Sequence, residues 1–127
     1  MKAVPIYLIL FLTPLFSVHA SDEEEGKNYF IGNCIGCHAF ACNKEGPSLG
    51  GLFGRKAASA EGYDAYSENL MSHGVVWNEE TLDDFFRDPG RFVMGSMAQY
   101  GKIDDPDLRR QVIAFLKTED PSVNLCL

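Results

Sequence analysis

The chain has 127 residues, and eighteen acidic side chains against eleven basic ones give it a formal net charge of −7 at pH 7. This length suits a single domain. An acidic surface repels nucleic acid and anionic membranes, so we expect neither as a partner.

Residues 1–20 have the pattern of a secretory signal peptide. Lys2 supplies a positive charge, residues 4–18 form an apolar run, and Val18-His19-Ala20 ends that run with a small-x-small pattern. This order predicts export and cleavage after the run, which leaves a domain of residues 21–127. The alternative is an uncleaved membrane anchor, but the run is short for a bilayer span and two prolines interrupt it.

Three helices are predicted in the remaining chain, and no strand alternation is apparent. The first covers about residues 22–33, the second begins after Asn78 as N-cap, and the last begins after Asp105 as N-cap. Residues 43–76 contain many glycines and predict loops, with at most a short helix near residues 67–72. Long loops are uncommon in a compact domain unless something holds them, so this pattern favours a central cofactor.

The two later helices carry apolar residues at helical spacing, which predicts their buried faces. Pro89-Gly90 is expected to end the earlier of the two. The residues predicted to be buried are Leu82, Phe85 and Phe86 in the one helix and Leu108, Val112, Phe115 and Leu116 in the other.

Cys34-Ile35-Gly36-Cys37-His38 is a C-x-x-C-H motif, which is typical of covalent attachment of a c-type haem. One helical turn can present Cys34 and Cys37 to the two haem vinyl groups as thioethers and direct the imidazole of His38 to the iron. The motif therefore predicts one covalent haem c, and with the signal peptide it indicates the bacterial periplasm.

The motif has three alternatives to haem attachment. A zinc site needs a second pair of ligands at suitable spacing, and none is evident. A thioredoxin-like dithiol lies in a βαβ pattern, which is absent. A chance match in a structural turn is the third alternative.

A six-coordinate haem iron needs a second axial ligand, and a methionine thioether is a soft ligand that raises the potential. Met71 lies near the predicted short helix, where packing is the simpler role. Met94 and Met97 lie in the loop between the last two helices, from which a ligand can reach across the haem.

Over nearly all of residues 21–127, the sequence resembles the class I cytochromes c. Gly26 and Phe30 match the contact between the family's first and last helices, and Gly46-Pro47-Ser48-Leu49 matches its loop on the histidine side. Met97 precedes Gly101 by four residues, as in the family pattern. The resemblance therefore favours Met97 as the second axial ligand over the other methionine of that loop.

The resemblance implies an all-α fold in which short helices and long loops wrap around one covalent haem c. It also implies that the carbonyl of Pro47 accepts the imidazole N–H of His38 and so orients this ligand. Arg55 would face a haem propionate, and Tyr66 and Trp77 would hydrogen-bond the propionates. The simpler alternatives are a core role for Trp77 and an exposed charge at Arg55.

The chain also departs from the commonest pattern of this family. Its methionine loop is one residue shorter, Met94 replaces the usual proline, and Phe85 stands where many members have a tyrosine that bonds the ligand sulfur. The ring of lysines typical of mitochondrial members is missing. The resemblance thus implies an electron carrier, but it does not identify the partners.

We expect a soluble, monomeric one-electron carrier of a respiratory or dehydrogenase-linked chain, with iron cycling between Fe(III) and Fe(II), and not an enzyme. Its expected partners are redox proteins that donate and accept the electron, without stable membrane insertion after signal cleavage. One alternative is a haem subunit of a larger oxidoreductase complex. The other is a small haem enzyme or gas-binding protein with a labile sixth ligand.

Two further expectations concern disulfide bonding and partner docking. Cys42 and Cys126 are predicted to form a disulfide, because haem takes the other two cysteines and the compartment is oxidising. Residues 31–43 and 92–101 contain no Lys, Arg, Asp or Glu, so we expect them to frame an apolar docking patch. The residues expected to be exposed in this patch are Ile35, Ala39, Phe40, Val93 and Ala98.

Overall fold

The computed structural model describes residues 1–5, 18–95 and 101–126. Its elements are α1 (Val18–Asn33), α2 (Glu68–His73), α3 (Glu79–Arg87), α4 (Pro89–Phe92), α5 (Pro106–Thr118) and the 3₁₀ helix η2 (Pro121–Val123). In this part of the chain, strand-like pairing is limited to an isolated bridge between Lys56 and Val76. The predicted all-α class is confirmed.

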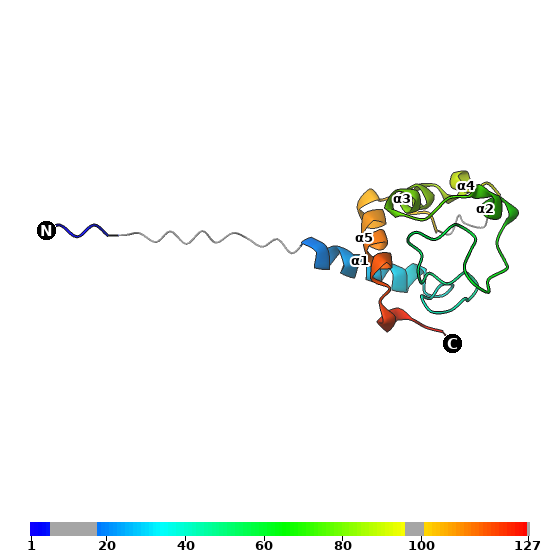
Figure 1. Cartoon of the computed structure of the whole chain (residues 1–127), viewed down its shortest axis with the longest axis horizontal. Coiled ribbons are helices and arrows are strands. Elements are labelled where there is room, and N and C mark those ends of the chain that lie inside the picture. The colour runs from blue at the N-terminus through cyan, green and yellow to red at the C-terminus, as the bar shows by residue number, and fades with distance from the viewer. Residues whose placement is uncertain (6–17, 96–100, 127) are drawn as a thin grey trace.

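Helices α1 and α5 pack across each other and form the main helix contact (Figure 1). Gly26 makes this approach possible, because a Cβ built there would lie 2.8 Å from the Phe115 Cβ and even closer to the Gln111 backbone. The ring of Phe115 lies 5.3 Å from that of Phe30, and Phe40 stacks on Phe30 at 5.6 Å. The expected contact between the first and last helices is therefore present.

The predicted helix starts are stabilised by local hydrogen bonds. The Asn78 side chain accepts from the Thr81 N–H at 2.9 Å, and the Thr81 hydroxyl accepts from the Asn78 N–H at 2.9 Å, which completes a capping box. The Asp105 side chain caps α5, and the Ser67 side chain caps α2. These starts follow from residues only three positions apart, so the sequence alone can predict them.

Some helix boundaries and buried faces differ from expectation. Helix α1 begins at Val18, because the residues before the acidic run continue the same helix. Pro89 follows the end of α3 but also starts α4, since proline suits a first helical turn and Asp88 caps it. Leu108 is only half-buried, and Arg109 instead takes a buried position on α5. Phe85 and Phe86 are also half-buried.

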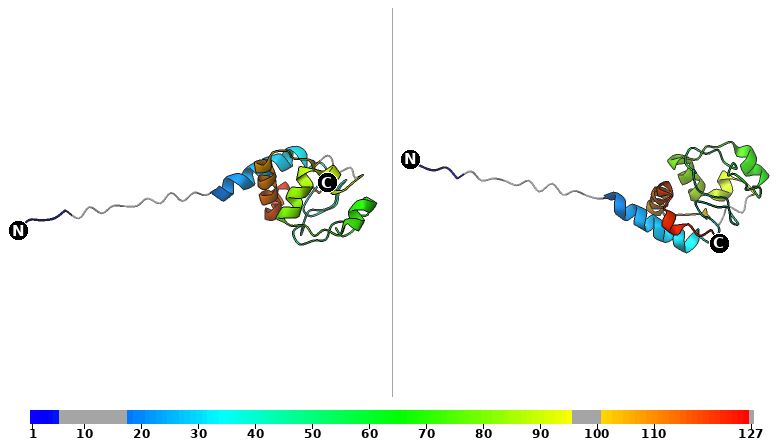
Figure 2. Two further views of the ribbon diagram at one scale, coloured as in Figure 1. Left: turned by 90° about the horizontal axis from the view of Figure 1, so that it is seen from above. Right: turned by 60° about the horizontal axis from the view of Figure 1, so that its bottom comes forward.

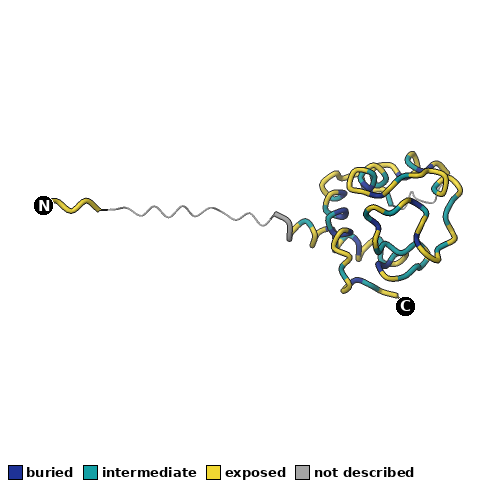
Figure 3. Tube along the Cα trace, viewed as in Figure 1, coloured by how far each residue is buried: buried dark blue, intermediate teal, exposed yellow. Residues whose placement is uncertain are grey.

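Buried positions are not confined to the helices but recur along the loops after α1 (Figure 3). Ala39, Phe40 and Val93 are only 0%, 6% and 2% exposed, so their expected place in an apolar docking patch is wrong. Phe40 is buried because it packs into the aromatic cluster of α1 and α5. Ile35 is half-buried, and Ala98 lies outside the described residues.

Arg109 joins three parts of the fold. Its side chain is only 8% exposed. Its Nε donates to Asp83 Oδ1 at 2.7 Å, and its Nη1 donates to the carbonyls of Ile103 and Asp104, both at 3.0 Å. Arg87 donates to the second oxygen of Asp83 at 2.6 Å. Arg109 therefore ties α5 to α3 and to the segment that follows the methionine loop.

Replacing Arg109 with leucine is expected to lower the free energy of unfolding by about 3 kcal/mol, because it removes the donor of two carbonyls and one of the two arginines that pair with the Asp83 carboxylate. Arg87→Leu is the matched control, since this arginine is exposed and its ion pair should contribute less than about 1 kcal/mol. Urea denaturation measures both variants. Equal losses would contradict a special role for the buried arginine.

The same ion pairs predict that the free energy of unfolding decreases at acid pH. Partial burial by itself would raise the pKa of Asp83, but hydrogen bonds from Arg109 and Arg87 outweigh it and hold this pKa below its ordinary value. Their stabilisation is therefore complete above the ordinary pKa of aspartate and is lost as pH falls through the lowered one.

In the described part of the chain, no helix combines the length and apolar character that crossing a membrane requires.

Candidate haem-attachment site

The C-x-x-C-H motif follows α1 directly and forms one helical turn. The N–H of Cys37 donates to the Cys34 carbonyl at 3.1 Å, and the N–H of His38 donates to the same carbonyl at 2.9 Å. Neither thiol of the motif forms a disulfide; Cys34 is half-buried and Cys37 is exposed. The two thiols and the imidazole are thus presented from one turn, as haem attachment requires.

The environment of Cys34 argues against a redox-active dithiol. Burial, and to a smaller extent the nearby Cys37, raises the pKa of its thiol to about 11. Dithiol oxidoreductases need the opposite shift, because the thiolate is their nucleophile. The described residues contain no group of three or more His, Cys, Asp or Glu that could hold a metal ion.

His38 is held by the loop that carries Pro47. Its Nδ1 lies 2.8 Å from the Pro47 carbonyl, so Nδ1–H donates there and Nε2 is the nitrogen left to bind iron. A Cβ at Gly46 would lie 2.7 Å from His38 Nε2, which explains the glycine before this proline. Burial is the main cause that lowers the pKa of His38, which favours the neutral imidazole that a metal needs.

Arg55 has a buried hydrogen-bond donor that lacks an acceptor in the described residues. Its Nη1 donates to the Gly50 carbonyl and its Nη2 to the Ser48 carbonyl, both at 2.9 Å. Its Nε is buried, and no described residue accepts a hydrogen bond from it. Buried N–H groups are rarely without an acceptor, so this atom fits the propionate contact that the resemblance implies.

Trp77 and Tyr66 lie on the segments that follow Arg55. The backbone N–H of Trp77 donates to the Arg55 carbonyl at 3.0 Å, so these two predicted site residues are brought together. Trp77 is buried, with its ring 5.5 Å from that of Phe85. The Tyr66 hydroxyl accepts from the Ala60 N–H at 3.0 Å, which leaves its own O–H to donate.

Met97 lies outside the described residues, as does the middle of its loop. At its far end the backbone of the loop lies close to α3, where a Cβ at Gly101 would lie 3.4 Å from the Phe85 ring. At the near end, the Asn69 side chain donates to the Met94 carbonyl. Met94 is 72% exposed.

Some contacts near the site could be predicted from the sequence, and others could not. The Cys42–Cys126 disulfide is confirmed, with a Cα–Cα distance of 5.9 Å. The hydrogen bonds of Asn124 with Ala41 and of Glu119 with Gly51 were not predicted, because no sequence motif indicates them. Such contacts depend on where the chain returns after α5.

The attachment turn, the oriented histidine and the partnerless Arg55 N–H together fit a haem. A family model described as cytochrome c matches residues 23–120. Cytochrome c of Cochliobolus lunatus is 36% identical over 101 residues, which cover 77% of this chain and 93% of that protein. Cytochrome c of Arabidopsis thaliana is 35% identical, with 77% and 89% covered.

The fold is also similar to that of a solved structure. Cytochrome cH from Methylobacterium extorquens superposes with a TM-score of 0.71 at 37% identity, over 76% of this chain and 98% of that one. Sequence, fold and site thus agree, and the chain belongs to the class I c-type cytochromes, which are haem-based electron carriers.

Proposed function

We propose that this chain is a soluble periplasmic carrier of single electrons in a respiratory or dehydrogenase-linked chain. The observation that carries the proposal is one site in which the C-x-x-C-H turn, the His38–Pro47 hydrogen bond and the buried Arg55 N–H meet the needs of one haem c. When bound, the haem supplies the Fe(III)/Fe(II) couple. Residues 1–20 are the signal peptide in this proposal, and residues 21–127 are the carrier.

The roles of the side chains follow from their chemistry. Cys34 and Cys37 would hold the haem through thioethers, and His38 and Met97 would be its axial ligands. Pro47 holds the imidazole in one orientation by accepting from Nδ1. The remaining site residues, on the propionate side, are Arg55, Tyr66 and Trp77.

An electron carrier, in contrast to a haem enzyme or gas-binding protein, has no need of an open iron position. Two protein ligands would fill both axial positions, so no substrate would bind the iron and no bond-making residue is required. We therefore propose no enzymatic activity. A fixed subunit of a larger complex would be recognised by co-purification from native periplasm or membranes, whereas the proposed monomer would elute alone.

The partners are proposed to be redox proteins that approach without forming a stable complex. Residues 21–127 have ten basic against eighteen acidic side chains, and this net charge of −8 favours attraction of basic partners over long range, with a rate that falls as salt rises. Nucleic acid is not proposed as a partner, and neither is stable insertion in a membrane once residues 1–20 are removed.

Met97→Ala is expected to give a high-spin or otherwise ligated haem, because the proposed thioether ligand is lost. Met94→Ala is the matched control from the same loop and should keep the low-spin spectrum, since Met97 is the proposed ligand. The near-infrared sulfur-to-iron band at neutral pH measures this difference. Loss of the band in Met94→Ala alone would contradict the assignment of Met97.

A further inference from the structure

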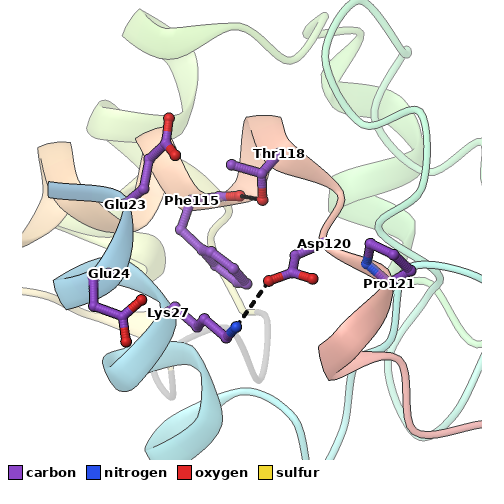
Figure 4. Close-up of a pocket in the computed structure, with 7 residues that line it drawn as sticks. All are labelled: Glu23, Glu24, Lys27, Phe115, Thr118, Asp120 and Pro121. Atoms are coloured by element: carbon purple, nitrogen blue, oxygen red, sulfur yellow. Dashed lines mark hydrogen bonds and ion pairs between the residues drawn. The ribbon is translucent and has the colours of Figure 1, made fainter. Parts of the chain in front are cut away.

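After α5, the chain returns over α1 towards the segment that follows the haem-attachment turn (Figures 1 and 2). We call residues 119–126 the C-terminal strap. Lys27 on α1 donates to Asp120 at 2.9 Å (Figure 4). It also donates to the Ser122 hydroxyl at 3.1 Å. Val123 is buried in the main core. The strap is therefore packed and bonded onto the domain.

We call residues 40–51 the histidine-side loop. The strap contacts this loop near each of the loop's two ends. Asn124 accepts from the Ala41 N–H at 3.0 Å, and Cys126 forms the disulfide with Cys42. At the other end, the Gly51 N–H donates to the Glu119 carboxylate. Three separate bonds thus bracket the part of the loop that lies between residues 42 and 51.

That bracketed part contains the acceptor for His38. Pro47 accepts from His38 Nδ1 at 2.8 Å, and Ser48 next to it accepts from Arg55 through its carbonyl. The Ser48 hydroxyl donates to the Phe40 carbonyl at 2.7 Å, so the middle of the loop is itself tied to its first residue. A shift of the loop ends would consequently move the Pro47 carbonyl.

The cysteine and asparagine of the strap are not part of the family match, which ends at residue 120. We propose that the C-terminal strap is a positioning element for His38, which keeps the Pro47 carbonyl on the imidazole by fixing both ends of the loop. The inference rests on the proposed function, in which His38 binds the haem iron. It assigns the disulfide a local role at the histidine side in addition to global stabilisation.

The test uses the ferrous holoprotein and its Cys42→Ser/Cys126→Ser variant. NMR follows solvent exchange of the His38 Nδ1–H and of the Phe115 amide, a reporter of the helix core. We expect the variant to accelerate exchange of the imidazole proton by at least about tenfold more than that of the amide, because the loop opens locally. Equal acceleration of both protons would overturn the proposal, since it would mean only global destabilisation.

Leu82→Ala is the matched control, because Leu82 is buried in α3 and lies outside both the strap and the loop. It should accelerate both protons by the same factor. Asn124→Ala keeps the disulfide and removes one of the three bonds, so it tests the same local opening if the cysteine variant does not fold. No preferential acceleration in Asn124→Ala would then count against the strap.

The absorption spectrum and intact mass of each protein separate this inference from the proposed function. A wild-type chain without covalent haem, or without a histidine-ligated iron, would contradict the proposed function and the inference together. A normal haem with equal exchange factors would contradict the strap alone.

Discussion

Serine at both Cys34 and Cys37 is expected to abolish covalent haem attachment, whereas the wild-type chain should carry one haem. The reason is chemical, since a hydroxyl does not form the thioether that each thiol forms with a vinyl group. Intact mass after acid–acetone extraction should show the polypeptide alone. The effect is all or none, and it should also weaken folding, because a domain of this size is near the low end for a self-sufficient core.

The matched control for this change is the Cys42→Ser/Cys126→Ser variant, which also removes two sulfurs but leaves the attachment turn intact. It should retain one covalent haem per chain. Haem that stays attached in the Cys34→Ser/Cys37→Ser variant, or that is lost from the control alone, would contradict the assignment of the motif.

Gly26→Val is expected to lower the free energy of unfolding by about 3 kcal/mol or to prevent folding. Any Cβ at this position meets the Gln111 backbone and lies 2.8 Å from the Phe115 Cβ, so α1 and α5 have to separate. This contact is between backbones, which cannot move aside as the end of a flexible side chain can. Urea unfolding of the holoprotein measures the loss.

Gly32→Ala on the same helix is the control for this prediction. No described atom lies within 4 Å of a Cβ built at Gly32, so alanine should be accepted there. Its better helix propensity should stabilise the protein by about 0.5 kcal/mol. Similar unfolding free energies for Gly26→Val and wild type would show that the two helices do not depend on close approach.

The features that sequence could predict are those set by residues close together in the chain. Asn78 and Thr81 are three apart and form their capping box, and Asp105 caps the turn that follows it. The C-x-x-C-H motif likewise needs only one turn to bring its thiols and imidazole together. Local geometry determines each of these features, so neighbouring residue types are enough.

Other features depend on parts of the chain that meet only in the folded protein. Arg109 reads as an exposed residue of a polar helix face, and only the return of residues 103–104 and α3 makes it a buried junction. Phe40 lies in an uncharged stretch that could equally be surface or core, and its stacking on Phe30 decides the question. The bond between Asn124 and Ala41 spans 83 positions and has no local signal.

A redox titration of the purified holoprotein, followed by its optical spectrum, tests the electron-carrier account most directly. The account predicts one covalent haem per chain, a single reversible one-electron transition, low-spin spectra in both states and a near-infrared sulfur-to-iron band in the oxidised form. A high-spin haem that binds exogenous ligands without displacing methionine, or a chain without covalent haem, would contradict it.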